Sequence, residues 1–365
     1  MRFRCERDTL AELIGTAQRA VATRAGANPV LSGVQLTTID NTLTAVGSDL
    51  ELTIRATAPA QVNTSGSVVV PARLVGDIVK ALDADDVSFE VEGEQAHLTT
   101  ARSSFTVRLL AGDDFPRVTE LDAPGVRVDA GALHEALRQV VPAASRDDSR
   151  PILTGVLLTS TNDGLRLVAT DSYRLAVRDL PGVSVLGEGQ KVLVSAKGFG
   201  EVQRLLGQGE IEMLFGTREV RVRVGSTEIT TRLIEGEFPN YEQLIPSGYP
   251  NRLVVHRDAL MEAAKRVRLV GQGRENAPLR LSMGPEGVEL SAIAQDVGEA
   301  RETVDAKYEG SDLTVAFNAD YLLDGLQAAA TDEVVIDSID ALKPATIRGI
   351  DRPEFLYLIM PMRIA

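Results

Sequence analysis

The sequence contains no tryptophan, and aromatic residues make up only 4% of the chain, so its cores have to be built from aliphatic side chains. A single cysteine, Cys5, excludes an internal disulfide and a metal site made of several cysteines. No segment approaches the roughly 20 apolar residues that span a bilayer, and the opening residues MRFRCERDTL lack the apolar core of a signal peptide. These absences predict a cytoplasmic protein.

Motifs of enzyme active sites are also missing. The three histidines, His97, His134 and His256, have no metal-binding spacing, and neither a GxSxG nor a GxxxxGK[ST] motif occurs. The glycine-rich segment GQGREN (271–276) is a poor match to nucleotide-binding fingerprints, and the acidic DADD (83–86) is interpreted as a solvated loop. We therefore expect a protein without catalytic activity, cofactor or metal.

The composition that is present is typical of a folded protein. The 365 residues predict two or three domains, and 44% apolar with 25% charged residues is the usual balance of a globular chain. The net charge of −14 argues against a broad basic face that binds nucleic acid. It permits basic residues that are confined to one surface.

The chain repeats itself three times. Each repeat contains an alternating apolar strand, a turn rich in Asn, Asp or Gly, and a second strand, which is a hairpin pattern. These hairpin segments are residues 29–56, 151–179 and 278–304, and they begin with PVLSGVQL, PILTGVLL and PLRLSMG, respectively. Helix-like segments precede them, with Leu10, Leu133 and Leu260 in matching places.

A second block, a short strand followed by a helix, recurs in the same order at 68–82, 192–206 and 315–329. The sequence therefore predicts an α+β protein of three repeated domains, each with two helices and about eight strands. The predicted domains are residues 1–122, 123–248 and 249–365, joined by linkers that contain Pro and Gly.

Cations recur at the same places in the second helices. Arg73 and Lys80 lie seven residues apart and share one helix face, and Lys197 and Arg204 have the same spacing and position in the next repeat. The second helix of the third repeat has Asp320 and Asp324 and no cation. Two interpretations stay open: an ordinary solvated helix face, or a surface that meets a polyanion through sequence-independent phosphate contacts.

Four motifs resemble one family over essentially the whole chain. VATDSYRLAV (168–177), RLIEGEFPNYEQLIP (232–246), FNADYLL (317–323) and YLIMPMRI (357–364) are similar to the bacterial sliding clamp, the beta subunit of DNA polymerase III holoenzyme. The resemblance implies a head-to-tail homodimer that closes into a ring, with helices lining the hole and sheets outside. It also implies a non-catalytic processivity factor that encircles duplex DNA and tethers the polymerase, which raises its effective concentration.

The resemblance assigns DNA contacts and a dimer interface. The implied DNA-binding residues are Arg24, Arg73, Lys80, Arg138, Arg146, Arg150, Lys197, Arg204, Lys265 and Arg266. The implied interface residues are Arg102 and Phe105 of the first domain, facing Leu269, Val270, Glu299 and Glu302 of the third domain of the other chain. From the sequence alone, Phe105 is equally well explained as a core residue of a strand.

The resemblance also assigns a cleft between the second and third domains for a short peptide of partner proteins, typically a Gln followed by Leu and Phe. Partners of this kind are the polymerase, the clamp loader and other DNA-processing proteins. The implied pocket residues are Leu153, Thr170, Ser172, Tyr173, Arg174, Leu175, Pro239, Leu244, Asn318, Tyr321, Ile339, Leu358, Ile359, Met360, Pro361, Met362 and Arg363. Phe355–Ile359 is expected to be a buried last strand, and the residues after it are expected to fold against the domain junction.

Two other classes of function stay open at this point. One is a repeat-built adaptor that binds only proteins, and the other is an enzyme with an unrecognised site. The repeated helix cations favour a DNA-encircling clamp over the adaptor.

Overall fold

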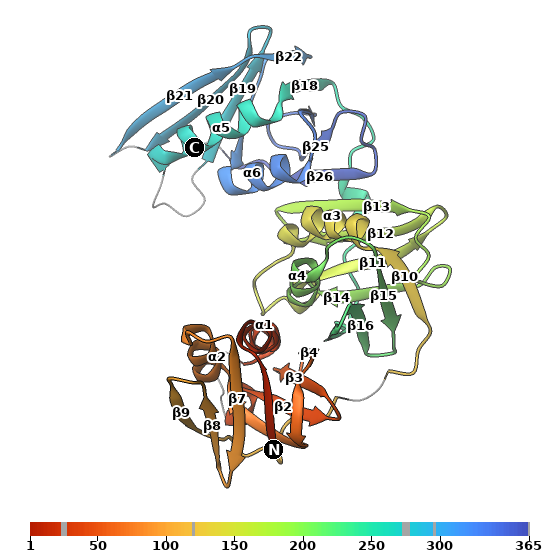
Figure 1. The fold of residues 1–365 in the computed structure, drawn as a ribbon. Coiled ribbons are helices and arrows are strands. Elements are labelled where there is room, and N and C mark those ends of the chain that lie inside the picture. Colours follow the sequence, from red (N-terminus) through yellow and green to blue (C-terminus); the bar gives the residue numbers. More distant parts are fainter. Residues whose placement is uncertain (23–27, 119–120, 272–277, 295–296, 364–365) are drawn as a thin grey trace. The chain divides into compact units, whose positions relative to one another are not determined.

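The computed structural model describes residues 1–22, 28–118, 121–271, 278–294 and 297–363 (Figure 1). The chain forms two compact units. The first contains Met1–Ala130 and Arg204–Leu233, and the second contains Gly131–Gln203 and Ile234–Ala365. The second of the three sequence repeats thus contributes to both units, and the predicted domain boundaries at 122 and 248 stay predictions.

The three repeats predicted from the sequence are confirmed, because the elements follow one another in the same order in each. The α-helices of the described residues come two to a repeat: α1 (Arg7–Ala17), α2 (Ala72–Ala81), α3 (Ala130–Val140), α4 (Ala196–Leu205), α5 (Arg257–Val267) and α6 (Ala319–Ala328). Short 3₁₀ turns are η1 (Gln18–Ala20), η2 (Pro29–Ser32), η3 (Val141–Ala143), η4 (Pro151–Thr154), η5 (Glu242–Leu244) and η6 (Arg268–Gly271).

The strands complete each repeat. The first repeat has β1 (Arg2–Glu6), β2 (Gly33–Ile39), β3 (Thr42–Ser48), β4 (Leu52–Pro59), β5 (Gln61–Thr64), β6 (Gly66–Pro71), β7 (Asp86–Glu92), β8 (Gln95–Thr99) and β9 (Ser104–Arg108). The second has β10 (Gly125–Asp129), β11 (Gly155–Thr161), β12 (Gly164–Thr170), β13 (Arg174–Pro181), β14 (Lys191–Ser195), β15 (Glu210–Phe215), β16 (Glu219–Val224) and β17 (Thr227–Arg232). The third has β18 (Asn251–His256), β19 (Pro278–Gly284), β20 (Gly287–Ala294), β21 (Gly298–Val304), β22 (Ala306–Glu309), β23 (Leu313–Asn318), β24 (Glu333–Ser338), β25 (Ala345–Gly349) and β26 (Phe355–Ile359).

Two antiparallel sheets build the first unit. One has the order β5-β1-β7-β8-β9, so β9 forms an edge. The other has the order β10-β15-β16-β17-β4-β3-β2-β6 and crosses from the second repeat to the first where β17 pairs with β4. Each repeat therefore supplies half of a continuous sheet, and the hydrogen-bonded joint connects the two repeats without a gap.

The second unit repeats this arrangement. Its nine-stranded sheet has the order β14-β11-β12-β13-β26-β25-β24-β18-β22, and the joint between repeats is the antiparallel pair of β13 and β26. Its four-stranded sheet has the order β21-β20-β19-β23, which places β21 at an edge. The helices α5 and α6 lie side by side in this unit (Figure 1).

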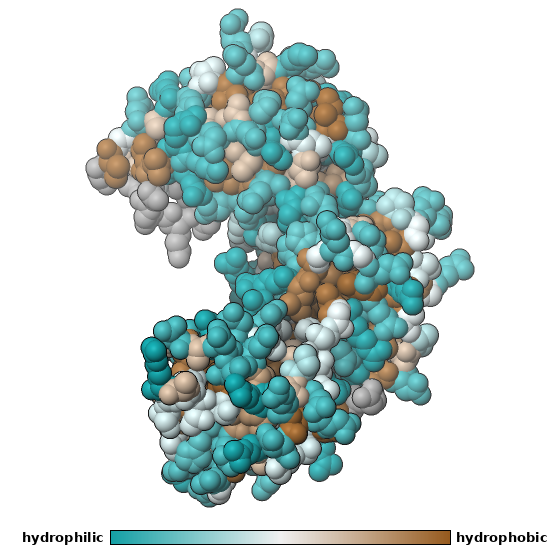
Figure 2. All heavy atoms as spheres, viewed as in Figure 1, coloured by the Kyte–Doolittle hydropathy of each residue, from teal (hydrophilic) through white to brown (hydrophobic). Residues whose placement is uncertain are grey.

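The helices are amphipathic and bury one face in mainly aliphatic cores. The matched leucines of the first helices, Leu10, Leu133 and Leu260, are all buried, as their equivalent positions predict. One aromatic pair interrupts the aliphatic packing, because Phe3 and Phe89 stack with ring centroids 4.9 Å apart. Figure 2 shows hydrophilic side chains over most of the visible face.

Candidate functional site

A tight turn joins β12 to β13 and presents the first of the predicted pocket residues. The Asp171 carboxylate accepts hydrogen bonds from the backbone N–H groups of Tyr173 (2.9 Å) and Arg174 (3.0 Å). Ser172 has a φ of 81°, a conformation that is strained for a residue other than glycine. The Thr170 hydroxyl donates to the carbonyl of Arg174 at 2.7 Å. These bonds hold a turn that leaves Tyr173 59% exposed.

The first repeat contains the same turn. The Asp49 carboxylate accepts from the N–H groups of Glu51 (3.1 Å) and Leu52 (2.7 Å), and Leu50 has a φ of 78°. The first and second repeats therefore share the strained backbone of this turn and differ in the side chains that it carries. The second repeat has Arg174 at the position where the first has Leu52.

Arg174 is the polar centre of this region and is buried. Its Nε donates to Asp171 Oδ2 at 2.9 Å, its Nη1 donates to Asp324 of α6, and its guanidinium lies 4.3 Å from the centre of the Tyr321 ring. Burial acts to lower the pKa of Arg174, but Tyr357, Asp324 and Asp171 around it outweigh burial and raise that pKa. The side chain is thus a fixed cation that connects β13 of the second repeat to α6 of the third.

The end of the chain lies against the same turn. The expected last strand Phe355–Ile359 is confirmed as β26, which pairs with β13. Beyond it, the N–H of Met360 donates to the carbonyl of Tyr173 at 2.9 Å, and the N–H of Met362 donates to the carbonyl of Ala316 at 2.7 Å. These backbone bonds place residues 360–363 beside the turn of the second repeat and β23 of the third.

Some predicted pocket residues present apolar surface to solvent. Tyr173 is 59% exposed, Leu244 is 48% exposed and Met360 is 37% exposed. Isolated exposed apolar residues are ordinary. These three, however, belong to the turn, the linker and the tail, which all carry predicted pocket residues. Also exposed are Ser172, Pro239 and Arg363, while Asn318, Tyr321, Ile339, Pro361 and Met362 are half-buried.

Other predicted pocket residues are core residues. Leu175 and Leu358 pack in one buried cluster with Leu157, and Ile359 is fully buried. Leu153 and Thr170 are buried as well. Leu358 and Ile359 are neighbours on β26 and face opposite sides of the sheet, yet both are buried, so this end of the strand is covered on both faces. Leu175, Leu358 and Ile359 are therefore core residues of the single chain, and their contact with a peptide stays a prediction.

The linker after β17 covers this apolar cluster. Tyr241 is buried in the cluster and meets Phe238 edge to face, with ring centroids 6.4 Å apart. Arg166 donates two hydrogen bonds to Asp179 (2.6 and 2.9 Å) and also interacts with the Tyr241 hydroxyl. These contacts anchor the linker segment, which carries the predicted pocket residues Pro239 and Leu244.

The predicted DNA-binding cations differ in how far they are engaged. Lys80 is exposed and makes no ion pair within the described part of the chain, and Arg73 reaches only as close as 3.9 Å to Asp77 on the same helix. Arg146, Lys197 and Arg204 are also exposed. Arg24 lies outside the described residues.

Arg138 has a structural role that its sequence position did not reveal. Its guanidinium donates to both oxygens of Glu135 (2.6 and 2.8 Å) and to the carbonyls of Gln327 (2.8 Å) and Ala328 (3.2 Å) at the end of α6. Hydrogen bonding to Arg138 lowers the pKa of Glu135. Since these partners occupy most of its N–H donors, Arg138 is suited to hold α3 to the end of α6.

Three further candidates are paired with carboxylates. Arg150 donates to Asp147 at 3.0 Å, in agreement with the acidic residues of its loop. Lys265 donates to Glu262 at 2.8 Å. Arg266 donates two hydrogen bonds to Glu302, so the structure pairs a predicted DNA contact with a predicted interface residue on the same chain.

The predicted dimer residues lie on or beside edge strands. Phe105, on the edge strand β9, is 39% exposed, so it is not a core residue. Arg102 beside it is exposed too. In the other unit, Glu299 is exposed on the edge strand β21, and Leu269 in the turn after α5 is 55% exposed. Val270 and Glu302 are half-buried.

Among the residues that the structure describes, no group of three or more His, Cys, Asp or Glu side chains is arranged to hold a metal ion. No helix in the described part of the chain has the length and apolar character needed to cross a membrane.

Family models match the chain in three consecutive parts. These are the N-terminal domain of DNA polymerase III beta subunit over residues 1–119, the central domain over 127–240 and the C-terminal domain over 242–363. The beta sliding clamp of Streptomyces coelicolor is 34% identical over 394 residues and covers 100% of both chains. That of Staphylococcus epidermidis is 30% identical and covers 100% of this chain and 99% of its own.

Solved structures agree over the full length. The DNA polymerase III beta subunit of Thermotoga maritima has a TM-score of 0.91 at 27% identity, with 100% of both chains covered. A sliding clamp of Pseudomonas aeruginosa bound to griselimycin has a TM-score of 0.90 at 31% identity, also with 100% of both chains covered.

Proposed function

The chain belongs to the DNA polymerase III beta subunit family, and on this premise we propose that it is a sliding clamp, a non-catalytic ring that encircles duplex DNA and tethers the replicative polymerase. The observation that carries this proposal is the match of all three family domains, in order, to three structurally equivalent repeats. The task requires a closed ring, a surface that tolerates sliding on DNA and a place for partners to attach.

The joints between repeats indicate how the ring closes. The last strand of the second repeat, β17, pairs with β4, and the last strand of the third repeat, β26, pairs with β13. In both joints, the last strand of one repeat pairs with the same strand of the repeat before it. The strand of the third repeat that is equivalent to β4 and β13 is β21, so β21 is the expected partner of β9, the last strand of the first repeat. Both are edge strands, so β9 is proposed to pair with β21 of a second copy.

The internal joints also supply a register. Ile229 lies opposite Ile54 in one joint, and Tyr357 lies opposite Ala176 in the other. Phe105 is equivalent to Ile229 when Arg108 is matched to Arg232. Ala300 is equivalent to Ala176, because Ala300 lies opposite Ala292 in its hairpin as Ala176 lies opposite Ala169. We therefore expect Phe105 to face Ala300 of the partner subunit, with Arg102 near the acidic residues of β21.

DNA contacts are proposed for the exposed cations of the helices. Arg73 and Lys80 on α2 and Lys197 and Arg204 on α4 repeat at equivalent places, and Arg24 and Arg146 are added from the sequence. Such contacts to phosphates are independent of base sequence and permit sliding. Arg150, Lys265 and Arg266 belong to the proposed set as well, although each is paired with a carboxylate. Arg138 is expected to contribute least, because most of its N–H donors are engaged within the chain.

The partner site is proposed at the turn of the second repeat. Tyr173, Leu244 and Met360 form its apolar rim, and the buried cluster around Leu358 supports it. A peptide with Gln, Leu and Phe suits apolar side chains flanked by the polar groups of Arg174 and the tail, and a methionine adapts to related peptides. The polymerase, the clamp loader and other DNA-processing proteins are the proposed partners, in the cytoplasm at the nucleoid.

Retention on DNA of different topology tests the proposal. After loading by a clamp loader, the protein is expected to stay on nicked circular DNA and to leave linear DNA of equal length through its ends. Equal retention on the two substrates would overturn the clamp function and favour an adaptor or a simple DNA-binding protein. A solution mass of one chain at assay concentration would overturn the closed ring.

A further inference from the structure

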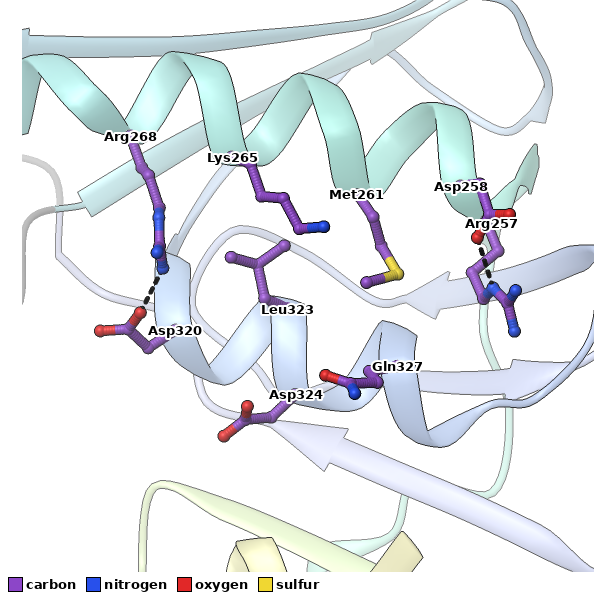
Figure 3. A pocket seen from close by; sticks show the side chains of 9 residues that line it. All are labelled: Arg257, Asp258, Met261, Lys265, Arg268, Asp320, Leu323, Asp324 and Gln327. Atoms are coloured by element: carbon purple, nitrogen blue, oxygen red, sulfur yellow. Dashed lines mark hydrogen bonds and ion pairs between the residues drawn. The ribbon is translucent and has the colours of Figure 1, made fainter. Parts of the chain in front are cut away.

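Asp324 of α6 lines a groove and also forms an ion pair with Arg174. It lines a groove of about 440 Å³ between α5 and α6, with Met261, Lys265 and Leu323 among its other lining residues. Figure 3 shows that its carboxylate points away from α5, whereas Arg268 of η6, the turn that follows α5, reaches Asp320. The carboxylate of Asp324 instead pairs with the guanidinium of Arg174.

The Arg174 guanidinium is held from three directions. Asp171 binds its Nε from the turn of the second repeat, Asp324 binds its Nη1 from the third repeat, and the face of Tyr321 lies over its central carbon. The exposed fraction of the Arg174 side chain is only 9%, so water contributes little to its solvation. A buried cation of this kind depends strongly on its paired carboxylates.

The same contacts set the walls of the peptide site. Tyr321 stacks on the exposed ring of Tyr173, with centroids 6.5 Å apart, and the Tyr357 hydroxyl donates to the carbonyl of Tyr321 at 2.9 Å. Arg174 therefore contacts the Tyr321 ring on which Tyr173 stacks, so a change in the orientation of Arg174 would remove the cation from the aromatic wall of the site.

We propose that Asp324 is a positioning residue of the peptide site, which holds Arg174 in the orientation that supports the Tyr321–Tyr173 wall. The proposal rests on the peptide-binding function proposed above. Asp324 does not touch the peptide and acts through Arg174. It also makes α6, a helix of the third repeat, part of a site whose turn belongs to the second.

Asp324→Asn tests this role, because Asn preserves the shape of Asp and removes its charge. The chain contains no tryptophan, so a Trp-labelled peptide of the Gln-Leu-Phe type reports binding by its own fluorescence. We expect the dissociation constant to rise about tenfold, since breaking one of two ion pairs of a buried arginine is costly. Asp320→Asn is the matched control, as that carboxylate lies one turn away and pairs with Arg268. It is expected to leave peptide binding unchanged.

A double-mutant cycle with Arg174→Met separates positioning from a general effect on folding. If Asp324 acts through Arg174, the Asp324→Asn effect on peptide binding disappears in the Arg174→Met background. Thermal melting of each variant shows whether it is folded at the titration temperature. An equal loss in both backgrounds, or no loss in Asp324→Asn, overturns the positioning role. Failure of the unmodified protein to bind the peptide would instead overturn the proposed peptide site.

Discussion

The proposed ring depends on Phe105, and replacing it with alanine gives a measurable prediction. Phe105 projects from the edge strand β9 and is 39% exposed in the single chain. An aromatic side chain of roughly 200 Å² therefore leaves about 80 Å² to be covered by a partner, which is worth about 2 kcal/mol at 25 cal/mol per Å². Because a head-to-tail dimer contains this contact twice, separation of the two chains of the variant should be easier by about 4 kcal/mol.

Sedimentation over a dilution series measures this change. The dissociation constant of Phe105→Ala is expected to rise by about three orders of magnitude, so dimers convert to single chains at concentrations where the original protein stays dimeric. Ile39→Ala is the control, since Ile39 is 65% exposed on β2 of the other sheet in the same repeat. An unchanged dissociation constant for Phe105→Ala, or an equal change for Ile39→Ala, would refute the pairing of β9 with β21.

The remaining predictions concern the helix cations and the tail. Lys80→Ala should weaken DNA binding and reduce the slope of log K against log salt by about 1, whereas Arg138→Ala should mainly lower the melting temperature, because Arg138 holds α3 to α6. Since Arg138 lowers the pKa of Glu135, that pair stabilises the fold above the ordinary Glu pKa and loses its effect as the pH falls, so the melting difference should shrink in acid. A salt slope that falls more in Arg138→Ala than in Lys80→Ala would contradict this division of roles. Deletion of residues 360–365 should abolish binding of the peptide and leave a folded dimer. Unchanged peptide binding in a titration of this variant would place the site elsewhere.

The role of Asp324 was not recognised from the sequence, although a signal for it exists. Tyr321 and Asp324 are three residues apart on α6, a spacing that puts their side chains on one face of a helix. That spacing could have linked the aspartate to the predicted site. Its partner, Arg174, is 150 residues away in the chain, so the sequence alone does not connect the two side chains.

The sequence by itself determined the repeats, the order of helices and strands within them and the family, since these depend on local alternation, turn residues and internal similarity. It did not determine which residues are available for binding. Phe105 is exposed and Ile359 is buried, although both are apolar residues of strands. Lys80 is unpaired among the described residues and Arg138 is engaged, although both are helix cations. Only the tertiary structure decides such differences, because burial and ion pairing depend on which groups from distant parts of the chain meet in space.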